Sequence, residues 1–249
     1  MPTARQKGRT GYGRVVLKLS GECFCGEGSK GFDAERVAFL AGEIGRAYEH
    51  CPQMAVVTGG GNIIRGATGG ALLPDRLSAD HAGMTATVVN ALVLSGALSQ
   101  AGIPCAVRGA FSVANMVREF DAREGRDILS AGCVLLLCGG TGNPFFSTDT
   151  ASALRAAELE AEAVLKATKV DGLYSSDPKT HPNAQRYERL THAEVITKRL
   201  AAMDLAAVWL CMEQQTPILV FRYDEPGNLE RAVKGERLGT LVSSFDNSG

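Results

Sequence analysis

The sequence predicts an α/β protein in which helices cover both faces of a mostly parallel central sheet, giving a three-layer αβα sandwich. Short runs of apolar, often β-branched residues alternate with longer segments whose apolar residues follow helical spacing. The short runs are apolar almost throughout, which is typical of strands buried on both faces. Neither a Pro/Ser-rich linker nor an internal repeat divides the chain. We therefore expect a flexible leader over residues 1–13 and a single domain over residues 14–249.

The elements follow in order along the chain. The predicted strands occupy residues 14–20, 54–58, 103–108, 133–138, 163–167 and 218–221, with an edge strand at 240–242. Three helices are predicted over residues 77–101, 113–121 and 148–159. Another begins after the N-cap residue Asp33, and one more begins at Asn228. A Thr191–Glu194 capping box predicts the start of a further helix, which runs past Arg199. Asp204 is expected towards the end of a helix and Trp209 in the core.

The composition excludes several classes of protein. Apolar residues make up 45% of the 249 and the formal net charge is −1, so the chain is neither disordered nor dominated by charge. With a pI of about 6.4, it lacks the positive excess of proteins that coat nucleic acid or an anionic membrane, and we expect neither as a partner. The longest apolar run, residues 133–138, is too short to span a bilayer.

The cysteines and histidines do not predict a metal site. The 7 cysteines contain no pair of C-x-x-C motifs spaced for zinc, and the 4 histidines are scattered along the chain. Reduced thiols are the expected state of these cysteines, and the first 13 residues lack the apolar core of a secretory signal. Both observations favour a cytoplasmic protein.

Three glycine-rich loops follow predicted strands directly. The first is at Lys18–Gly21, where the strand predicted over residues 14–20 ends, and the other two begin at Gly59 and Gly139; they account for part of an unusually high glycine content of 29 in 249 residues. Glycines at such positions let backbone N–H groups face an anion, and the third loop runs into a helix whose N-terminus also favours negative charge. Because the carboxyl ends of parallel strands meet at one edge of a sheet, the loops together predict a polyphosphate site.

The familiar phosphate-binding and nucleophile motifs do not explain this site. The Walker pattern is absent, and so are the S-x-x-K and G-x-S-x-G motifs of nucleophilic enzymes. A G-x-G-x-x-G pattern at residues 26–31 lies several residues beyond its strand, whereas a dinucleotide fingerprint needs the glycines in the strand-to-helix turn. A Rossmann dehydrogenase is therefore not expected.

A series of short motifs resembles one known family over roughly residues 14–242. The motifs are KLSGE at 18–22, GGGNIIRG at 59–66, DHAGM at 80–84, TGNPFFSTD at 141–149, KATKVDG at 166–172, DP at 177–178, MDL at 203–205 and GTL at 239–241. In order and spacing they resemble the bacterial UMP kinases (uridylate kinases) of the amino acid kinase superfamily. The resemblance implies the amino acid kinase fold and the reaction ATP + UMP → ADP + UDP in pyrimidine nucleotide biosynthesis.

The resemblance also assigns binding residues. For ATP it implies Lys18, Leu19, Ser20, Gly21, Gly61, Arg65, Thr168, Tyr174 and Asp177. For UMP it implies Gly60, Asp80, Thr141, Gly142, Asn143, Pro144, Phe145, Phe146, Ser147 and Thr148. Phe145 and Phe146 could equally pack the loop onto the sheet, and Tyr174 could close the edge of a core.

The expected catalytic residues are Lys18, Asp149 and Lys169, with Lys166 a close rival of Lys169. Lysine suits phosphoryl transfer because its compact charge can follow the moving phosphoryl group. Asp149 is expected to orient the lysines rather than act as a base, because the phosphate oxygens of UMP are already ionised. Mg²⁺ is expected to arrive with ATP, without named protein ligands.

Relatives in this family assemble as hexamers, so a homo-oligomer is expected, with the apolar segment 86–101 as interface or core. GTP and UTP are the candidate effectors, although residues 94–99 lack the basic residues that many relatives carry there for control by GTP. Two other functions stand as alternatives. One is a carboxylate or carbamate kinase of the same superfamily, and the other is a nucleotide- or oxyanion-binding storage protein without catalysis.

Overall fold

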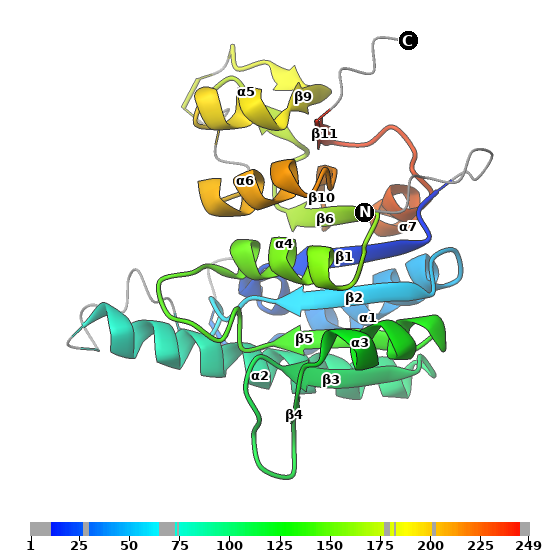
Figure 1. The fold of residues 1–249 in the computed structure, drawn as a ribbon. Coiled ribbons are helices and arrows are strands. Elements are labelled where there is room, and N and C mark those ends of the chain that lie inside the picture. Colours follow the sequence, from blue (N-terminus) through cyan, green and yellow to red (C-terminus); the bar gives the residue numbers. More distant parts are fainter. Residues whose placement is uncertain are drawn as a thin grey trace.

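A nine-stranded sheet runs through the described part of the chain (Figure 1). The computed structural model describes residues 11–26, 30–64, 73, 75–176, 180–181, 183–200 and 203–244. The strand order is β4-β3-β5-β2-β1-β6-β10-β11-β9. The strands are β1 (Arg14–Leu19), β2 (Gln53–Thr58), β3 (Cys105–Gly109), β4 (Arg118–Glu119), β5 (Val134–Cys138), β6 (Ala163–Thr168), β9 (Arg189–Thr191), β10 (Ile218–Arg222) and β11 (Thr240–Ser243). A separate pair is formed by β7 (Leu173–Tyr174) and β8 (Arg186–Tyr187).

The sheet is parallel from β4 to β10, and only the pairing of β10 with β11 is antiparallel. All strands from β4 to β10 therefore end at the same edge. Each of the three glycine-rich loops leaves the sheet there, after β1, β2 or β5. The predicted parallel α/β architecture is confirmed.

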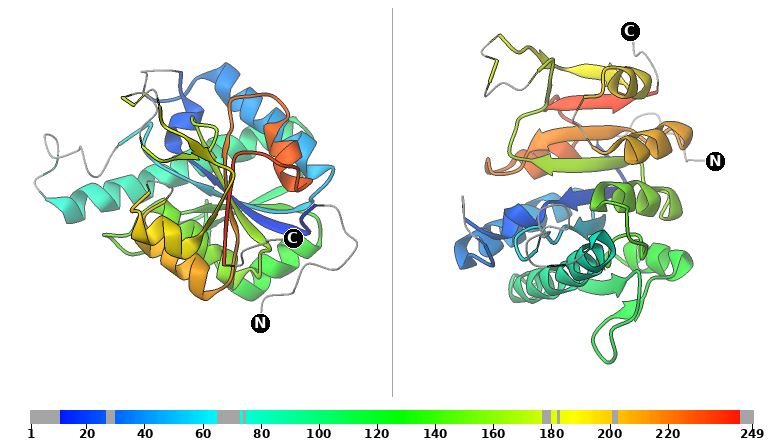
Figure 2. Two further views of the ribbon diagram at one scale, coloured as in Figure 1. Left: turned by 90° about the horizontal axis from the view of Figure 1, so that it is seen from above. Right: turned by 90° about the vertical axis from the view of Figure 1, so that its left-hand side faces the viewer.

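Helices cover both faces of the sheet (Figures 1 and 2). They are α1 (Ala34–Tyr48), α2 (Arg76–Gln100), α3 (Ala122–Ser130), α4 (Thr148–Glu158), α5 (His192–Thr197), α6 (Leu205–Glu213) and α7 (Asn228–Val233). Strand residues alternate between two apolar layers: Leu17 packs with α1, α2 and α7, whereas Val16 packs with α3, α4, α5 and α6. These two layers are the core of the three-layer sandwich.

Side-chain caps begin most of the helices. Asp33 caps α1 as predicted, and Thr191 and Glu194 form the complete capping box of α5. Asp75, Asp121 and Ser147 cap α2, α3 and α4 by accepting backbone N–H bonds.

Several sequence expectations were wrong in detail. Residues 113–121 are not helical, because Val113 and Val117 face each other across a tight turn as a β-bridge and α3 begins only after Asp121. Helix α5 ends at Thr197, before Arg199. Strand β11 is not at the edge of the sheet, since β9 pairs with its outer side.

Two expectations for α6 also fail. Asp204 is the N-cap of α6, where its carboxylate accepts the Ala207 N–H, rather than a residue near the end of a helix. Trp209 is 54% exposed on the outer side of α6 instead of lying in the core.

Helix α2 is 25 residues long, and it is the one helix in the described ranges that is long and apolar enough to cross a membrane. Core helices pass the same test of length and composition. Here Ala91, Leu94 and Leu98 pack in the layer below the sheet, and the helix carries the buried amide of Asn90. Figure 1 shows its N-terminal turns reaching beyond the ends of β2 and β5, where the glycine-rich loops lie.

Candidate active site

Two buried lysines share one carboxylate where β1 and β6 end. Lys18 and Lys166 are register partners on these adjacent strands and point to the face covered by α4. Asp149, in the first turn of α4, lies 2.8 Å from the Lys18 Nζ and 2.5 Å from the Lys166 Nζ. The side chain of Lys18 is 9% exposed, that of Lys166 is 12% exposed and that of Asp149 is 14% exposed. The sheet register and the start of α4 thus build a cluster with two positive charges and one negative charge.

Burial and charge shift the pKa values in this cluster. Burial, followed by the neighbouring Lys18 ammonium, lowers the pKa of Lys166 to about 8. Burial alone would raise the pKa of Asp149, but Lys18 and Lys166 outweigh it and hold this pKa below its usual value. Asp149 is therefore ionised at neutral pH, and it is better placed to hold two ammonium groups than to accept a proton.

The first two glycine-rich loops pack backbone against backbone. A Cβ on Gly21 would lie 2.4 Å from the Gly61 nitrogen, so a side chain there has no room. The Gly59 N–H donates to the Leu19 carbonyl over 2.8 Å, which ties the two loops together. This close approach requires glycine and leaves backbone rather than side chains at the strand tips.

A cavity of about 190 Å³ lies between these loops, the start of α2 and the loop after β5. Residues that line it include Gly60, Gly61, Asp80, Gly83, Met84, Thr87, Gly140, Phe146 and Thr148. Since Thr148 precedes Asp149 in α4, the cavity adjoins the lysine cluster. The arrangement places two cations beside a recess with an acidic group in its wall.

Asp80 joins α2 to the loop after β5. It pairs with Arg76 at 2.7 Å and accepts the Phe145 backbone N–H at 2.8 Å. Burial by itself would raise the pKa of Asp80, but the Arg76 and Phe145 hydrogen bonds outweigh it and lower the pKa. Asp80 therefore stays charged in the wall of the cavity and fixes the loop that closes it.

This geometry can be set beside known proteins. A family model, the amino acid kinase family, matches residues 13–222. The chain is 45% identical over 236 residues to the chloroplastic uridylate kinase PUMPKIN of Arabidopsis thaliana, covering 94% of this chain and 70% of the relative. The chain belongs to the amino acid kinase family.

Solved structures agree with this assignment. The UMP kinase of Bacillus anthracis superposes with a TM-score of 0.92 at 32% identity, covering 95% of this amino acid kinase and 98% of that chain. The UMP kinase of Ureaplasma parvum gives a TM-score of 0.87 at 36% identity, covering 92% and 98% of the two chains.

In this amino acid kinase, the expected UMP residues divide into two groups. Gly60, Asp80, Phe146 and Thr148 line the cavity, and Gly61, which the resemblance assigned to ATP, lines it as well. The others form the loop around it. The Thr141 hydroxyl donates to the Asn143 carbonyl, Gly142 and Phe145 have positive φ, and Ser147 caps α4. Pro144 lies in the same loop.

The expected ATP residues lie around the ends of β1 and β6. Leu19 ends β1, Ser20 caps the short 3-10 helix Gly21–Phe24, and the Thr168 hydroxyl donates to the Val170 carbonyl. The Tyr174 hydroxyl donates to Asp171, a bond that raises the pKa of Tyr174. Arg65 and Asp177 lie outside the described residues, as do residues 1–10 of the expected leader.

The two rival lysines occupy different positions. Lys166 contacts Asp149, whereas Lys169 is half-exposed beyond the end of β6 and pairs with Glu22 at 3.4 Å. The sequence ranking of Lys169 above Lys166 is therefore not supported by the contacts of the two side chains. No group of three or more metal-ligating side chains is gathered within the described ranges.

Sequence reasoning missed a buried polar network that holds the loops. The Gly139 N–H donates to the Thr87 hydroxyl at 2.6 Å, and the Asn90 amide donates to the Gly59 carbonyl and to Asn62. The available signal was the pair Thr87 and Asn90, polar residues three positions apart inside an apolar helix. Asp204, which the sequence placed near the end of a helix, accepts hydrogen bonds from Ser147 and Thr150 and so joins the start of α6 to the start of α4.

Proposed function

We propose that this protein transfers the γ-phosphoryl group of ATP to UMP, giving ADP and UDP. The observation that carries the proposal is the Lys18–Asp149–Lys166 cluster beside the cavity that Asp80 lines. The sequence and structural similarity to uridylate kinases supports UMP as the acceptor. Consumption of UMP would give the enzyme a role in pyrimidine nucleotide biosynthesis.

Phosphoryl transfer mainly requires the protein to align two anions and to stabilise charge on the group that moves. In the proposed mechanism Lys18 and Lys166 neutralise the oxygens of the transferred group. Asp149 holds both ammonium groups in position, because its carboxylate contacts each of them. The helix dipole of α4, which begins at this point, adds positive potential. No general base is needed, since the attacking phosphate oxygen of UMP is already ionised.

We assign Lys166, rather than Lys169, as the second cation. Lys166 is buried and shares the Asp149 carboxylate, whereas Lys169 bridges to Glu22 at the rim. In this proposal Lys169 steadies the loop after β1 and approaches ATP from outside. Gly21 offers backbone to the ATP phosphates, and the Tyr174 ring lies next to the nucleoside.

Mg²⁺ neutralises charge on the ATP phosphates when it is bound. Both carboxylates of the proposed site already have partners: Asp149 contacts two ammonium groups, and Asp80 contacts Arg76 and the Phe145 N–H. The residues present therefore fit an ion carried mainly by nucleotide phosphates and water, as is usual for Mg²⁺.

A coupled assay tests the function directly. Release of ADP is measured with ATP and Mg²⁺ and one acceptor at a time: UMP, CMP, dUMP, acetylglutamate, aspartate or carbamate. The proposal expects turnover with UMP above all others. Turnover with a carboxylate or carbamate and none with UMP would assign the alternative kinase activity, and tight ATP binding without any turnover would indicate a storage protein.

Asp80 provides a matched test of the acceptor side. Asp80→Asn removes the charge in the cavity wall and weakens the hold on Phe145, so the KM for UMP is expected to rise at least about tenfold while that for ATP changes little. Asp75→Asn, at the exposed start of the same helix, is the control and should leave both constants nearly unchanged. Equal increases in the two KM values for Asp80→Asn would contradict the assignment.

We also propose that copies of the chain associate through α1 and α2, with a hexamer as the expected assembly. A groove of about 750 Å³ between these helices is lined by apolar and small residues such as Val37, Ala41 and Val93. Beside it Val89 is 42% exposed and Leu92 is 36% exposed. An apolar surface of this kind is typical of contacts between subunits.

A reducing compartment such as the cytoplasm is the proposed location, since all seven cysteines are free thiols. GTP and UTP are the proposed effectors. Rates of ADP release measured across UMP concentrations, with and without GTP or UTP, test this regulation. Rates that neither nucleotide changes would contradict the proposal that they are effectors.

A further inference from the structure

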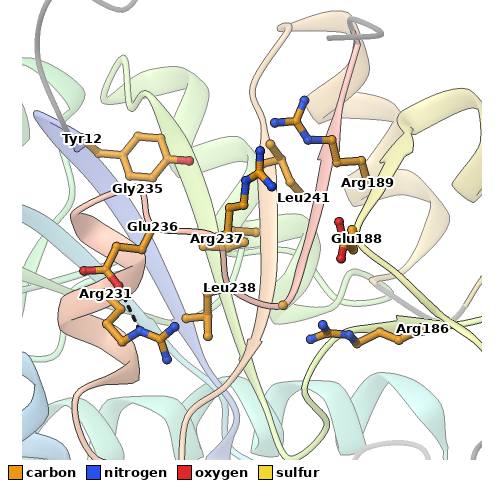
Figure 3. Close-up of a pocket in the computed structure, with 12 residues that line it drawn as sticks. Tyr12, Arg186, Glu188, Arg189, Arg231, Gly235, Glu236, Arg237, Leu238 and Leu241 are labelled. Carbon is orange, nitrogen blue, oxygen red and sulfur yellow. Dashed lines mark hydrogen bonds and ion pairs between the residues drawn. The ribbon is translucent and has the colours of Figure 1, made fainter. Parts of the chain in front are cut away.

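A second recess in the described part of the chain is lined by arginines. It encloses about 480 Å³ beside α7, on the face of β10 and β11 that also carries the α1 layer (Figure 3). Its floor is formed by Leu219 and Leu241, which are register partners on the two strands, together with Leu238. The ring of Tyr12 closes one end. None of the residues that line this recess lines the Asp80 cavity or belongs to the lysine cluster.

Four arginines from separate segments line this recess. Arg186 comes from β8, Arg189 from β9, Arg231 from α7 and Arg237 from the segment before β11. Figure 3 shows Arg186 and Arg231 extending into the recess from opposite sides, with Arg237 and Arg189 higher in the view. Among the described residues two carboxylates, Glu188 and Glu236, line the same recess, and a third, Asp171, pairs with Arg186 at its edge. The positive charges therefore exceed the negative ones.

The carboxylates do not neutralise all of these arginines. Glu236 is bound to Arg231 at 3.0 Å, and Arg186 is paired with Asp171, whose carboxylate lies 3.4 Å and whose carbonyl oxygen lies 3.2 Å from the guanidinium. Arg237 forms no hydrogen bond or ion pair with another residue in the described ranges. Gathering guanidinium groups costs electrostatic free energy, which an anion in the recess would offset.

We propose that this recess binds a soluble organic phosphate whose apolar or aromatic part rests on the leucine floor. Guanidinium groups present flat pairs of N–H donors that match phosphate oxygens. The leucine floor and the Tyr12 ring supply apolar contacts for the organic part of the ligand, which inorganic phosphate lacks. The volume falls in the range of small-molecule sites. The recess shares no lining residue with the Asp80 cavity, although Arg186 at its edge is the register partner of Tyr174, which the proposal places beside the nucleoside of ATP.

The test is calorimetric titration of the whole protein with 1-naphthyl phosphate and with inorganic phosphate as probes. Titrations are run with and without UMP and a non-hydrolysable ATP analogue, which occupy the proposed active site. We expect saturable binding of 1-naphthyl phosphate that persists with those nucleotides present and is at least about tenfold tighter than binding of inorganic phosphate. Equal affinities for the two probes, or loss of binding when the nucleotides are added, would overturn the proposal.

Charge-reversal variants locate the binding. Arg237→Glu should weaken the binding of 1-naphthyl phosphate at least about tenfold, whereas Arg123→Glu, the same charge change on exposed α3, should not. Both arginines are exposed, and thermal unfolding and the rate of ATP consumption serve as checks that the variants fold. Equal weakening by the two variants would mean a general effect of net charge and would contradict the site. Binding to phosphatidic acid vesicles that Arg237→Glu abolishes, with no binding of the soluble probes, would assign the arginines to a lipid surface instead.

Discussion

Lys166 illustrates how one side chain acquires its chemistry from its neighbours. Its amine is buried, lies beside the Lys18 ammonium and contacts Asp149. Burial and the like charge of Lys18 lower its pKa to about 8, against an ordinary value of 10.5. Near neutral pH Lys166 therefore carries its positive charge, but it loses the proton far more easily than an exposed lysine does.

This pKa predicts a pH dependence. Below about pH 8 Lys166 is protonated and, in the proposed mechanism, attracts the ATP phosphates, and as the pH rises through about 8 it becomes neutral. The value of kcat/KM for ATP, which reports groups of the free enzyme, is therefore expected to fall across this range. In Lys166→Arg the guanidinium stays charged, so the decline near pH 8 should disappear even if the maximum rate is lower. Identical profiles for the two proteins would exclude Lys166 as the titrating group.

Asp149 is expected to hold together a cluster that would otherwise repel itself. Asp149→Asn leaves two buried ammonium groups without their shared carboxylate and should lower the free energy of unfolding by about 3 kcal/mol. ATP phosphates can take over the role of the carboxylate, so ATP should stabilise this variant more than it stabilises the unchanged protein. Urea unfolding with and without ATP measures both effects.

Asp127→Asn, at an exposed position of α3, is the control for Asp149→Asn and should unfold like the unchanged protein. A variant at Asp149 that is as stable as this control would show that the lysines do not need the carboxylate.

At the scale of elements, the site depends on loops and a helix that approach each other without side chains between them. The φ of Gly139 is +80°, a left-handed conformation that favours glycine, and its N–H reaches the Thr87 hydroxyl in α2. Gly60 lies against the same helix, where a Cβ would come within 2.6 Å of the Gly83 carbonyl oxygen. The helix and the strand tips thus form one packed unit.

Gly60→Ala tests this packing. The added methyl group must separate the loop after β2 from α2, which we expect to cost about 1–3 kcal/mol of unfolding free energy and to raise the KM for UMP. Gly96→Ala in the same helix has open space around its Cβ and should instead add about 0.5–1 kcal/mol. If the urea midpoints of both variants shift in the same direction relative to the unchanged protein, this account of the packing is wrong.

The sequence predicted elements best where local chemistry decides them. Asp33 and the Thr191–Glu194 pair begin helices because their side chains bind nearby backbone N–H groups, and such bonds need no tertiary contact. The helix predicted over residues 113–121 was wrong, since Val113 and Val117 face each other across a tight turn. Strands β7, β8 and β9 were not predicted, because two or three residues carry too little pattern.

At the scale of the whole molecule, the long helix α2 serves two surfaces. One side packs against the sheet through Leu94 and Leu98, while Val89 and Leu92 remain exposed beside the groove with α1. Under the proposed self-association, these exposed residues are covered by a second copy of the chain.

Leu92→Glu should therefore reduce the assembly, because a carboxylate would have to be buried in an apolar contact. Size-exclusion chromatography with light scattering should give a lower mass for this variant than for the unchanged protein. Leu205→Glu, at a 45% exposed position of α6, is the matched control and should keep the original mass. An unchanged mass for Leu92→Glu would place the subunit contact elsewhere.

The amino-acid sequence by itself determined the parallel α/β architecture and the three glycine-rich loops at strand ends, and its motifs marked Lys18, Asp80 and Asp149 as candidate site residues. Each of these features can be recognised from a short segment of the sequence: an apolar run, a glycine cluster or a motif. Only the tertiary structure decided that Lys166 rather than Lys169 meets Asp149, because strand register and burial depend on residues far away in the chain. The same holds for the arginine-lined recess, since its four arginines come together only when β8, β9, α7 and the segment before β11 pack side by side.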